Sequence, residues 1–235
     1  MKGKIKFHSI FYRCILFMIL FCFFVLHTIS NGQAITVNLF EKPLTIAWKQ
    51  LSYIVIIIFV AVTVISSIAN WKFYISKEGI FLRKINLLIT WEEIIAINHI
   101  WINKIYRPSV GRFFLYNSKT IVIHRENYKP ICICNISLLA LYVIKFYNPK
   151  TKTNITFATL ATAFNIALNA VILYEVYDGD LLNMQFEIFM ILTGLYAVKS
   201  FVLPLLMVRH QNKLYRSSLS HERINKTNYS EAIYL

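Results

Sequence analysis

The sequence is poor in charged residues, in aspartate, and in the glycine and proline that break regular structure. Only 15% of its 235 residues are charged and 57% are apolar, whereas a soluble domain carries about 25% charged and 45–50% apolar residues. The chain has too little polar material to cover a core of its own, which excludes an ordinary soluble enzyme and a disordered chain. Six glycines and five prolines exclude collagen-like and proline-rich architectures, and four cysteines do not make a disulfide framework.

Long stretches without charge are what the sequence has instead. A helix needs about 20 apolar residues to cross the hydrocarbon core of a bilayer. The predicted membrane spans are 14–30, 51–69, 155–174 and 188–208. The second is apolar on every face and is bracketed by Trp48 and Trp71, at the depth where aromatic belts form. We therefore expect an α-helical membrane protein with four transmembrane helices.

The first span has a second interpretation, as a cleaved signal peptide. Lys2, Lys4, Lys6 and Arg13 precede the apolar stretch, and residues 32–34 loosely resemble a cleavage site. Against cleavage, the stretch is long and three more spans follow it. A retained membrane anchor is the favoured interpretation, and cleavage stays open.

Charge is distributed unevenly between the segments that flank the spans. Segment 70–154 has 13 basic and four acidic residues, whereas loop 175–187 has four acidic residues and no basic one. Positively charged loops stay on the cytoplasmic side of a membrane. We therefore expect a multi-pass cell-membrane protein with both termini in the cytoplasm. Its predicted parts are an N-terminal tail and transmembrane hairpin at 1–69, a cytoplasmic domain at 70–154, a second transmembrane hairpin at 155–208 and a basic cytoplasmic tail at 209–235.

Segment 70–154 changes character, because its apolar residues occur in short β-type runs rather than in spanning lengths. The predicted strands are 71–76, 80–84, 87–91, 94–102, 112–116, 120–125 and 131–134. Turn signals separate them, among them Lys77-Glu78-Gly79, whose glycine can supply a positive φ angle. A helix is predicted over 138–147, with Pro149 soon after its end.

Seven antiparallel strands closed by one C-terminal helix resemble the layout of the pleckstrin-homology (PH) superfold. Two motifs sharpen the resemblance, FYISKEGI at 73–80 and ITWEEI at 89–94, which are similar to a pattern of bacterial PH-like domains. Such domains often follow two N-terminal membrane helices in small bacterial proteins of unknown function. The resemblance covers about two thirds of the chain and implies a PH-like fold for 70–154. Another small β-rich domain is the alternative.

Catalytic chemistry has few residues to use. Only two aspartates occur, Asp178 and Asp180, and both lie in the predicted outer loop. The sequence contains no P-loop, dinucleotide-binding, zinc-protease, serine-hydrolase or CxxC motif. Cys132 and Cys134 are interpreted as small buried hydrophobes rather than as metal ligands. We therefore expect no enzyme, no catalytic or metal site and no cofactor.

Lys199 is the one charged residue inside a predicted span. It lies 12 residues beyond Glu187, roughly 18 Å along a helix and near the midplane of the bilayer. A charge there costs on the order of 3 kcal/mol or more and usually has a partner. Asn165 and Asn169 lie at comparable depth and share one helix face. We predict an intramembrane polar cluster of these three residues; in the alternative, Lys199 snorkels toward a headgroup layer.

The excess of basic residues indicates a partner. The bases of 70–154 are scattered in a domain tethered beside the bilayer, which favours anionic headgroups over nucleic acid. Candidate headgroup contacts are Arg83, Lys84, Lys150 and Lys152. We expect a non-enzymatic scaffold, envelope-maintenance or self-protection protein whose domain docks to the membrane surface or to an unidentified protein, a second copy of the chain included. The alternative is a component of a small carrier or channel with a polar path around Lys199.

Overall fold

The structure is a computed structural model of the chain. It describes residues 3–30, 33–39, 42–69, 71–109, 112–178, 185–217, 219 and 232–235. The chain divides into two compact units, which are described separately. Unit 1 comprises residues 1–10, 70–165 and 194–235, and unit 2 comprises residues 11–69 and 166–193.

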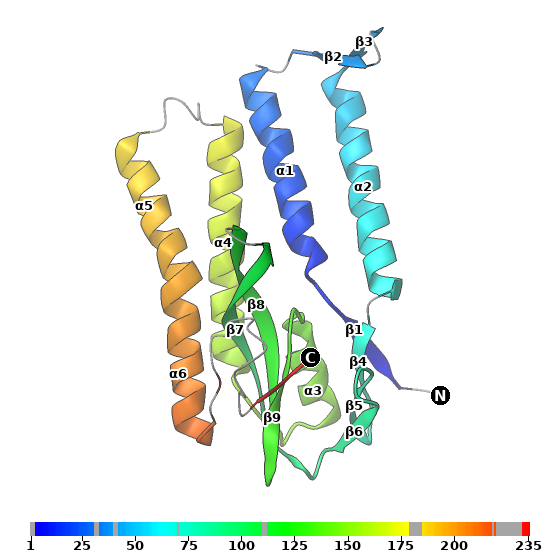
Figure 1. Cartoon of the computed structure of the whole chain (residues 1–235), viewed down its shortest axis with the longest axis vertical. Coiled ribbons are helices and arrows are strands. Elements are labelled where there is room, and N and C mark those ends of the chain that lie inside the picture. Colours follow the sequence, from blue (N-terminus) through cyan, green and yellow to red (C-terminus); the bar gives the residue numbers. More distant parts are fainter. Residues whose placement is uncertain are drawn as a thin grey trace. The chain divides into compact units, whose positions relative to one another are not determined.

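Four helices are long and apolar enough to cross a membrane. They are α1 (Tyr12–Ile29), α2 (Trp48–Ala69), α4 (Ile155–Asp178) and a fourth helix made of α5 (Phe186–Ala197), the π-helix η1 (Val198–Val202) and α6 (Leu203–Tyr215) (Figure 1). The expectation of four apolar helices is confirmed, and these helices mark the chain as a multi-pass membrane protein. The fourth helix is longer than the predicted span 188–208, because it continues without a break as far as Tyr215.

Unit 2 contains α1, α2 and the hairpin between them, formed by β2 (Ile35–Leu39) and β3 (Lys42–Ile46). The end of α1 is joined to α4, because the Thr28 hydroxyl donates to the Val176 carbonyl at 2.6 Å. His27 stacks on Tyr177 with ring centroids 5.2 Å apart and contacts the edge of Trp48 at 4.9 Å. Polar and aromatic contacts therefore fix the end of α1 within this unit.

Unit 1 contains two sheets. The first has the order β1-β4-β5-β6 and is antiparallel throughout. Its strands are β1 (Ile5–His8), β4 (Trp71–Ile75), β5 (Gly79–Leu82) and β6 (Leu87–Thr90). The turn before β5 needs a glycine, as the sequence predicts: Gly79 has φ +150°, and a Cβ there would lie 2.0 Å from the Ile89 carbonyl oxygen.

The second sheet has the order β10-β7-β8-β9-β11. Its long strands are β7 (Ile94–Ser109), β8 (Arg112–Arg125) and β9 (Tyr128–Ile133), and its edges are β10 (Lys152–Thr153) and β11 (Ile233–Tyr234). The prediction of two separate strands at 112–116 and 120–125 is wrong, because β8 runs through both. The helix expected at 138–147 is confirmed as α3 (Leu139–Tyr147).

Both faces of the second sheet are buried. Along β8, Ile121 and Ile123 belong to a core shared with the first sheet and α3, whereas Val122 belongs to a second core. The second core also holds Met207 of α6 and Ala161 of α4. Because one face packs against sheet and helix and the other against α4 and α6, these strands carry apolar residues at consecutive positions rather than at alternate ones.

Candidate functional site

Basic and aromatic side chains adjoin one another on the first sheet of unit 1. Trp71 lies between two cations: Lys6 Nζ is 5.2 Å and Arg83 Cζ is 4.8 Å from the centroid of its ring. Lys4 Nζ lies 4.7 Å from the ring of Tyr74 and 3.3 Å from its hydroxyl. The rings of Trp71 and Tyr74 are 6.4 Å apart. We call Lys4, Lys6, Trp71, Tyr74 and Arg83 the basic–aromatic surface.

Strand register brings these residues together from two distant parts of the chain, 4–6 and 71–83. Lys6 of β1 pairs with Tyr74 of β4, and the preceding part of β4 pairs with the end of β1. Arg83 follows β5, and its backbone N–H donates to the Lys72 carbonyl at 3.0 Å. A cation against an aromatic face gains about 0.5–1 kcal/mol at an exposed site. The contacts therefore hold two positive charges beside one indole ring.

Along the sequence, the strands of this surface are close to two of the apolar helices. β4 begins two residues after α2 ends at Ala69, and two residues span at most about 7 Å. Nearer the N-terminus, α1 begins four residues after β1 ends at His8. Trp71 thus lies at a membrane-helix end, where tryptophan is enriched because one part of its ring is apolar and the other polar.

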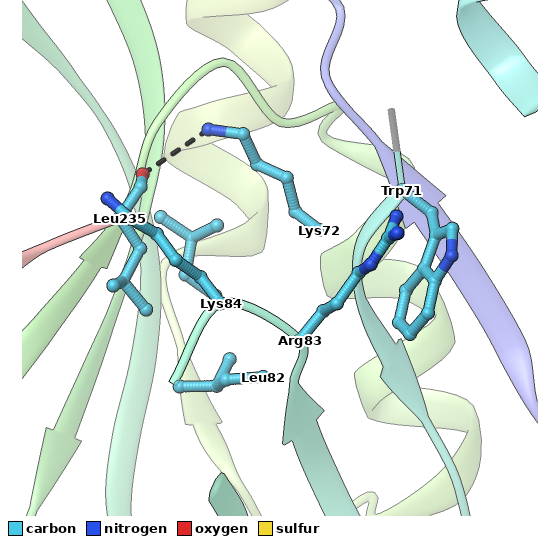
Figure 2. Close-up of a pocket in the computed structure, with 7 residues that line it drawn as sticks. Trp71, Lys72, Leu82, Arg83, Lys84 and Leu235 are labelled. Atoms are coloured by element: carbon cyan, nitrogen blue, oxygen red, sulfur yellow. Dashed lines mark hydrogen bonds between the residues drawn. The ribbon is translucent and has the colours of Figure 1, made fainter. Parts of the chain in front are cut away.

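A basic pocket adjoins the surface (Figure 2). Its volume is about 390 Å³, and its lining consists of Trp71, Lys72, Leu82, Arg83, Lys84, Ile133 and Leu235. The Lys72 ammonium donates to the main-chain oxygens of Cys134 at 2.9 Å and of Leu235 at 3.3 Å. Among the residues that the structure describes, the lining thus has three basic side chains and no acidic one.

The electrostatics of the pocket are dominated by positive charge. Desolvation of the half-buried ammonium is the main cause that lowers the pKa of Lys72; Cys134 opposes this shift, and the positive charges of Lys104 and Lys84 have smaller effects that lower the pKa further. The Cys134 carbonyl on Lys72 is a neutral acceptor, and even a carboxylate at Leu235 would leave the three bases in excess. An anion is therefore what this arrangement can bind.

The predicted headgroup contacts divide into two pairs. Arg83 and Lys84 both line the basic pocket. Lys150 is exposed after α3, and Lys152 is exposed in β10, which pairs with β7 of the second sheet. Lys152 lies three residues before α4 begins, so Lys150 and Lys152 are also close to a membrane-helix end along the chain. Neither Lys150 nor Lys152 lines the pocket.

The predicted polar cluster of the spans stays a prediction. Asn165 and Lys199 are buried in unit 1, whereas Asn169 belongs to unit 2. Lys199 lies in the π-helix, with its ammonium 4.4 Å from the Tyr196 ring centroid. The Asn117 side chain of β8 donates to the backbone carbonyl of Lys199 at 3.2 Å. A structural lysine fits this position as well as a lysine of a polar path, so the carrier alternative stays an expectation.

Sequence reasoning misses the parts of the site that come from outside 70–154. It assigns Lys4 and Lys6 to a tail, although the run KIKFH at 4–8 alternates polar and apolar residues as a strand does. Leu235 carries no comparable signal, because β11 has only two residues. Lys72 is visible in the sequence only as the first base after a span, and its place in a pocket follows from its long-range contacts.

Two histidines and two cysteines of the β-rich region are buried. His99 and His124 are buried in the second sheet, Cys132 belongs to the second core, and Cys134 is buried just after β9. Within the described ranges, no group of three or more His, Cys, Asp or Glu could hold a metal ion.

Comparison with known proteins gives no match: no family model matches the chain, and no curated protein or solved structure resembles it significantly.

Proposed function

We propose that the chain is a non-enzymatic membrane protein whose segment 70–154 is a PH-like cytoplasmic domain that docks, together with β1, onto the anionic headgroups of its own membrane. The docking face is the basic–aromatic surface. The protein would then hold its domain flat against the inner leaflet, in a scaffolding, envelope-maintenance or self-protection role.

The strand layout supports the PH-like part of this proposal. β4, β5 and β6 form consecutive antiparallel pairs, as do β7, β8 and β9, and α3 follows β9 directly. The two sheets share one core, which α3 closes with Ala140, Leu141 and Ile144. Two sets of three consecutive antiparallel strands, followed by a helix that closes their shared core, agree with the resemblance seen in the sequence, although the edge strands β10 and β11 pair in parallel with the second set.

A single observation carries the docking part: Trp71 lies between Lys6 and Arg83, two residues beyond the end of α2. At such a position an indole enters the headgroup layer, and the bases beside it are attracted to anionic lipid by about 1 kcal/mol each. The same bases in bulk solvent would gain nothing from the indole beyond a weak cation–π contact.

Hydrogen–deuterium exchange of the full chain in nanodiscs tests the proposal. We expect backbone amides of 71–84 to exchange more slowly in discs that contain phosphatidylglycerol than in discs of neutral phosphatidylcholine. Lys4→Gln with Lys6→Gln removes two exposed bases of the surface. Their loss should weaken docking by about 2 kcal/mol, about 30-fold in the ratio of docked to undocked domain, and should reduce the lipid-dependent protection.

Lys77→Gln with Lys129→Gln is the matched control, because both side chains are exposed and neither belongs to the surface. It removes the same charge and should leave most of the protection in place. Equal exchange in the two kinds of nanodisc would contradict docking. Equal weakening by the two double variants would reduce the effect to net charge alone and would also contradict the proposed face.

A further inference from the structure

The fourth apolar helix changes its surroundings along its length. α5 buries none of its residues, whereas α6 buries four of its 13. The contacts of α6 are specific: Met207 Sδ accepts from the Trp101 backbone N–H at 3.3 Å, and Gln211 Oε1 accepts from the Asn98 side chain at 2.6 Å. α6 is therefore fixed on the second sheet, whereas burial gives α5 no such anchor.

The π-helix η1 lies where this change occurs. Counted back from Gln211, the next buried positions on this face are 207 and 204, at the spacing of three or four residues that an α-helix gives. The buried residue before them is Lys199, five positions before Pro204. The wider turn thus places Lys199 on the face that meets the sheet, where an α-helix would place Ser200. One residue of an α-helix corresponds to a rotation of about 100°, so η1 determines how the helix before it is turned.

Pro204 leaves the Lys199 carbonyl without a donor from its own helix. The Leu203 N–H, which would reach this carbonyl in an α-helix, donates to the Val198 carbonyl instead. The next N–H along the helix would come from position 204, and proline has none. The Asn117 side chain of β8 fills the gap, because it donates to the Lys199 carbonyl at 3.2 Å. The sheet therefore satisfies a backbone group that the helix itself cannot satisfy.

The alternative to this π-helix is a continuous α-helix that carries a different defect. In that form the Leu203 N–H returns to the Lys199 carbonyl, and the carbonyl without a donor becomes that of Ser200, where the ring of Pro204 would also clash. Each form thus has one unsatisfied carbonyl, and only the π form has its carbonyl bonded by Asn117. π-helices of a single turn are rare and occur mostly at functional sites.

We infer that η1 is a hinge, held in its π form by Asn117, through which the second sheet controls the rotation of α5. A change to the α form turns α5 by about 100° and moves it by about 1.5 Å along the axis of α6, and the bond from Asn117 is lost. Because α6 stays fixed on the sheet, a movement of the membrane segment reaches the sheet through this bond. The hinge goes beyond docking of the domain, because it connects the domain to a conformational change in a membrane helix.

Distances between two spin labels on the full chain in nanodiscs test the inference. Phe189→Cys in α5 and Lys129→Cys in β9 replace exposed residues and carry the labels. Cys14→Ser with Cys22→Ser removes the exposed native thiols. In this background, Asn117→Val removes the donor to η1. We expect a second distance component whose population rises about fivefold or more, because a buried hydrogen bond is lost from one form only.

Asn103→Val is the matched control. Asn103 lies opposite Asn117 in the register of β7 and β8, so the two side chains share one face of the sheet. Its Oδ1 atom has no hydrogen-bond partner among the described residues. The same loss of an amide at this position should leave the distance distribution unchanged.

Pro204→Ala tests the origin of the dependence on Asn117. The substitution supplies the missing N–H and removes the ring, so it should favour the α form and shift the mean distance. In this background Asn117→Val should add nothing, because the helix no longer needs a donor from the sheet. A second component that Asn117→Val produces equally with and without Pro204→Ala would overturn the inference.

Two further results would also overturn it: an unchanged distribution in Asn117→Val, or equal effects of Asn117→Val and Asn103→Val. Slow hydrogen exchange of the amides that pair β7 with β8 verifies that each variant is folded. If Asn117→Val alone does not fold, the Pro204→Ala background decides, and an unchanged mean distance there would contradict the hinge. None of these substitutions lies in the basic–aromatic surface, so the hinge and the docking proposal can fail separately.

Discussion

His99 and His124 are held neutral inside unit 1. Burial is the main cause that lowers the pKa of each to about 4. The Ile136 carbonyl opposes the shift at His99, and the Gln211 side chain opposes it at His124. His124 also stacks on Tyr215 of α6 with ring centroids 4.1 Å apart. Both histidines therefore serve packing at neutral pH rather than proton transfer.

The depressed pKa values predict that unit 1 is destabilised as the pH falls from about 6.5 to about 4. In this window the unfolded chain binds protons that the folded histidines do not, so stability rises with pH. Each histidine accounts for on the order of 3 kcal/mol of stability that is present above pH 6.5 and is lost by about pH 4. In histidine-labelled protein in micelles, the NMR signals of His99 and His124 should stay constant between about pH 8 and about pH 5.5.

His99→Gln and His124→Gln assign these two signals, and the four remaining histidines provide the internal comparison. The thermal unfolding midpoint should fall as the pH is lowered from about 6.5 to about 4. His124→Gln should make this fall shallower, because it removes one of the two buried histidines. A titration of either signal with a midpoint near the ordinary histidine value of about 6.5 would contradict the buried neutral state.

Residue-level properties can be predicted from the sequence only where local composition determines them. The burial of Cys132 follows from an apolar strand and is predicted correctly. The π-helix at Lys199 and the main-chain contacts of Lys72 depend on neighbours far away in the chain, such as Asn117 and Leu235. No local pattern encodes such contacts.

At the scale of elements, β8 shows why a polar interruption need not end a strand. Asn117, Ser118 and Lys119 suggest a break between two short strands. In the structure they stay in register with β7, where Asn117 pairs with Asn103 and Ser118 pairs with Ile102. Buried Ser118 is accommodated because its hydroxyl donates to Asn135 at 3.1 Å. Strand pairing and a side-chain hydrogen bond thus override the low β-propensity of these residues.

The edge strand β11 carries the prediction at this scale. Deleting 232–235 removes the backbone pairing with β9, withdraws Leu235 from the first core and withdraws Tyr234 from the second. Each lost backbone hydrogen bond costs about 1 kcal/mol, and the lost apolar contacts add to this. We therefore expect the amides of 131–134 to exchange at least tenfold faster in the shortened chain, as measured by hydrogen–deuterium exchange.

Leu235→Ala is the matched variant, because it keeps the backbone pairing and removes only a side chain. It should accelerate exchange less than the deletion does, while the amides that pair β7 with β8 remain protected in both. Unchanged exchange at 131–134 after the deletion would show that β11 does not stabilise the sheet edge.

At the scale of the whole molecule, hydropathy locates the four apolar helices but does not tell what each apolar residue contacts. α5 buries none of its residues, as expected of a segment that faces lipid. α6 continues the same helix, yet Met207 and Val208 are buried in the second core against the sheet. An apolar side chain looks the same in the sequence in both settings, which is why the predicted span 188–208 includes residues that belong to a protein core.

The arrangement of charge predicts the sidedness of the whole chain. If all four apolar helices span the membrane, both termini lie on one side, and the net charge of +9 over 70–154 against −4 over 175–187 predicts that this side is the cytoplasm. Single cysteines introduced by Thr36→Cys, Gln185→Cys and Lys129→Cys replace exposed residues. With a membrane-impermeant maleimide, the first two should be labelled in intact cells, and the third only after permeabilisation.

The unaltered chain is the control, because Cys132 and Cys134 are buried and Cys14 and Cys22 belong to α1, where lipid would shield them from a water-soluble reagent. Labelling at Lys129→Cys in intact cells would place segment 70–154 outside. The basic–aromatic surface would then face the outer side of the membrane, and attraction to the inner leaflet could not be its role. The topology experiment is therefore the first to perform, since the docking proposal depends on its outcome.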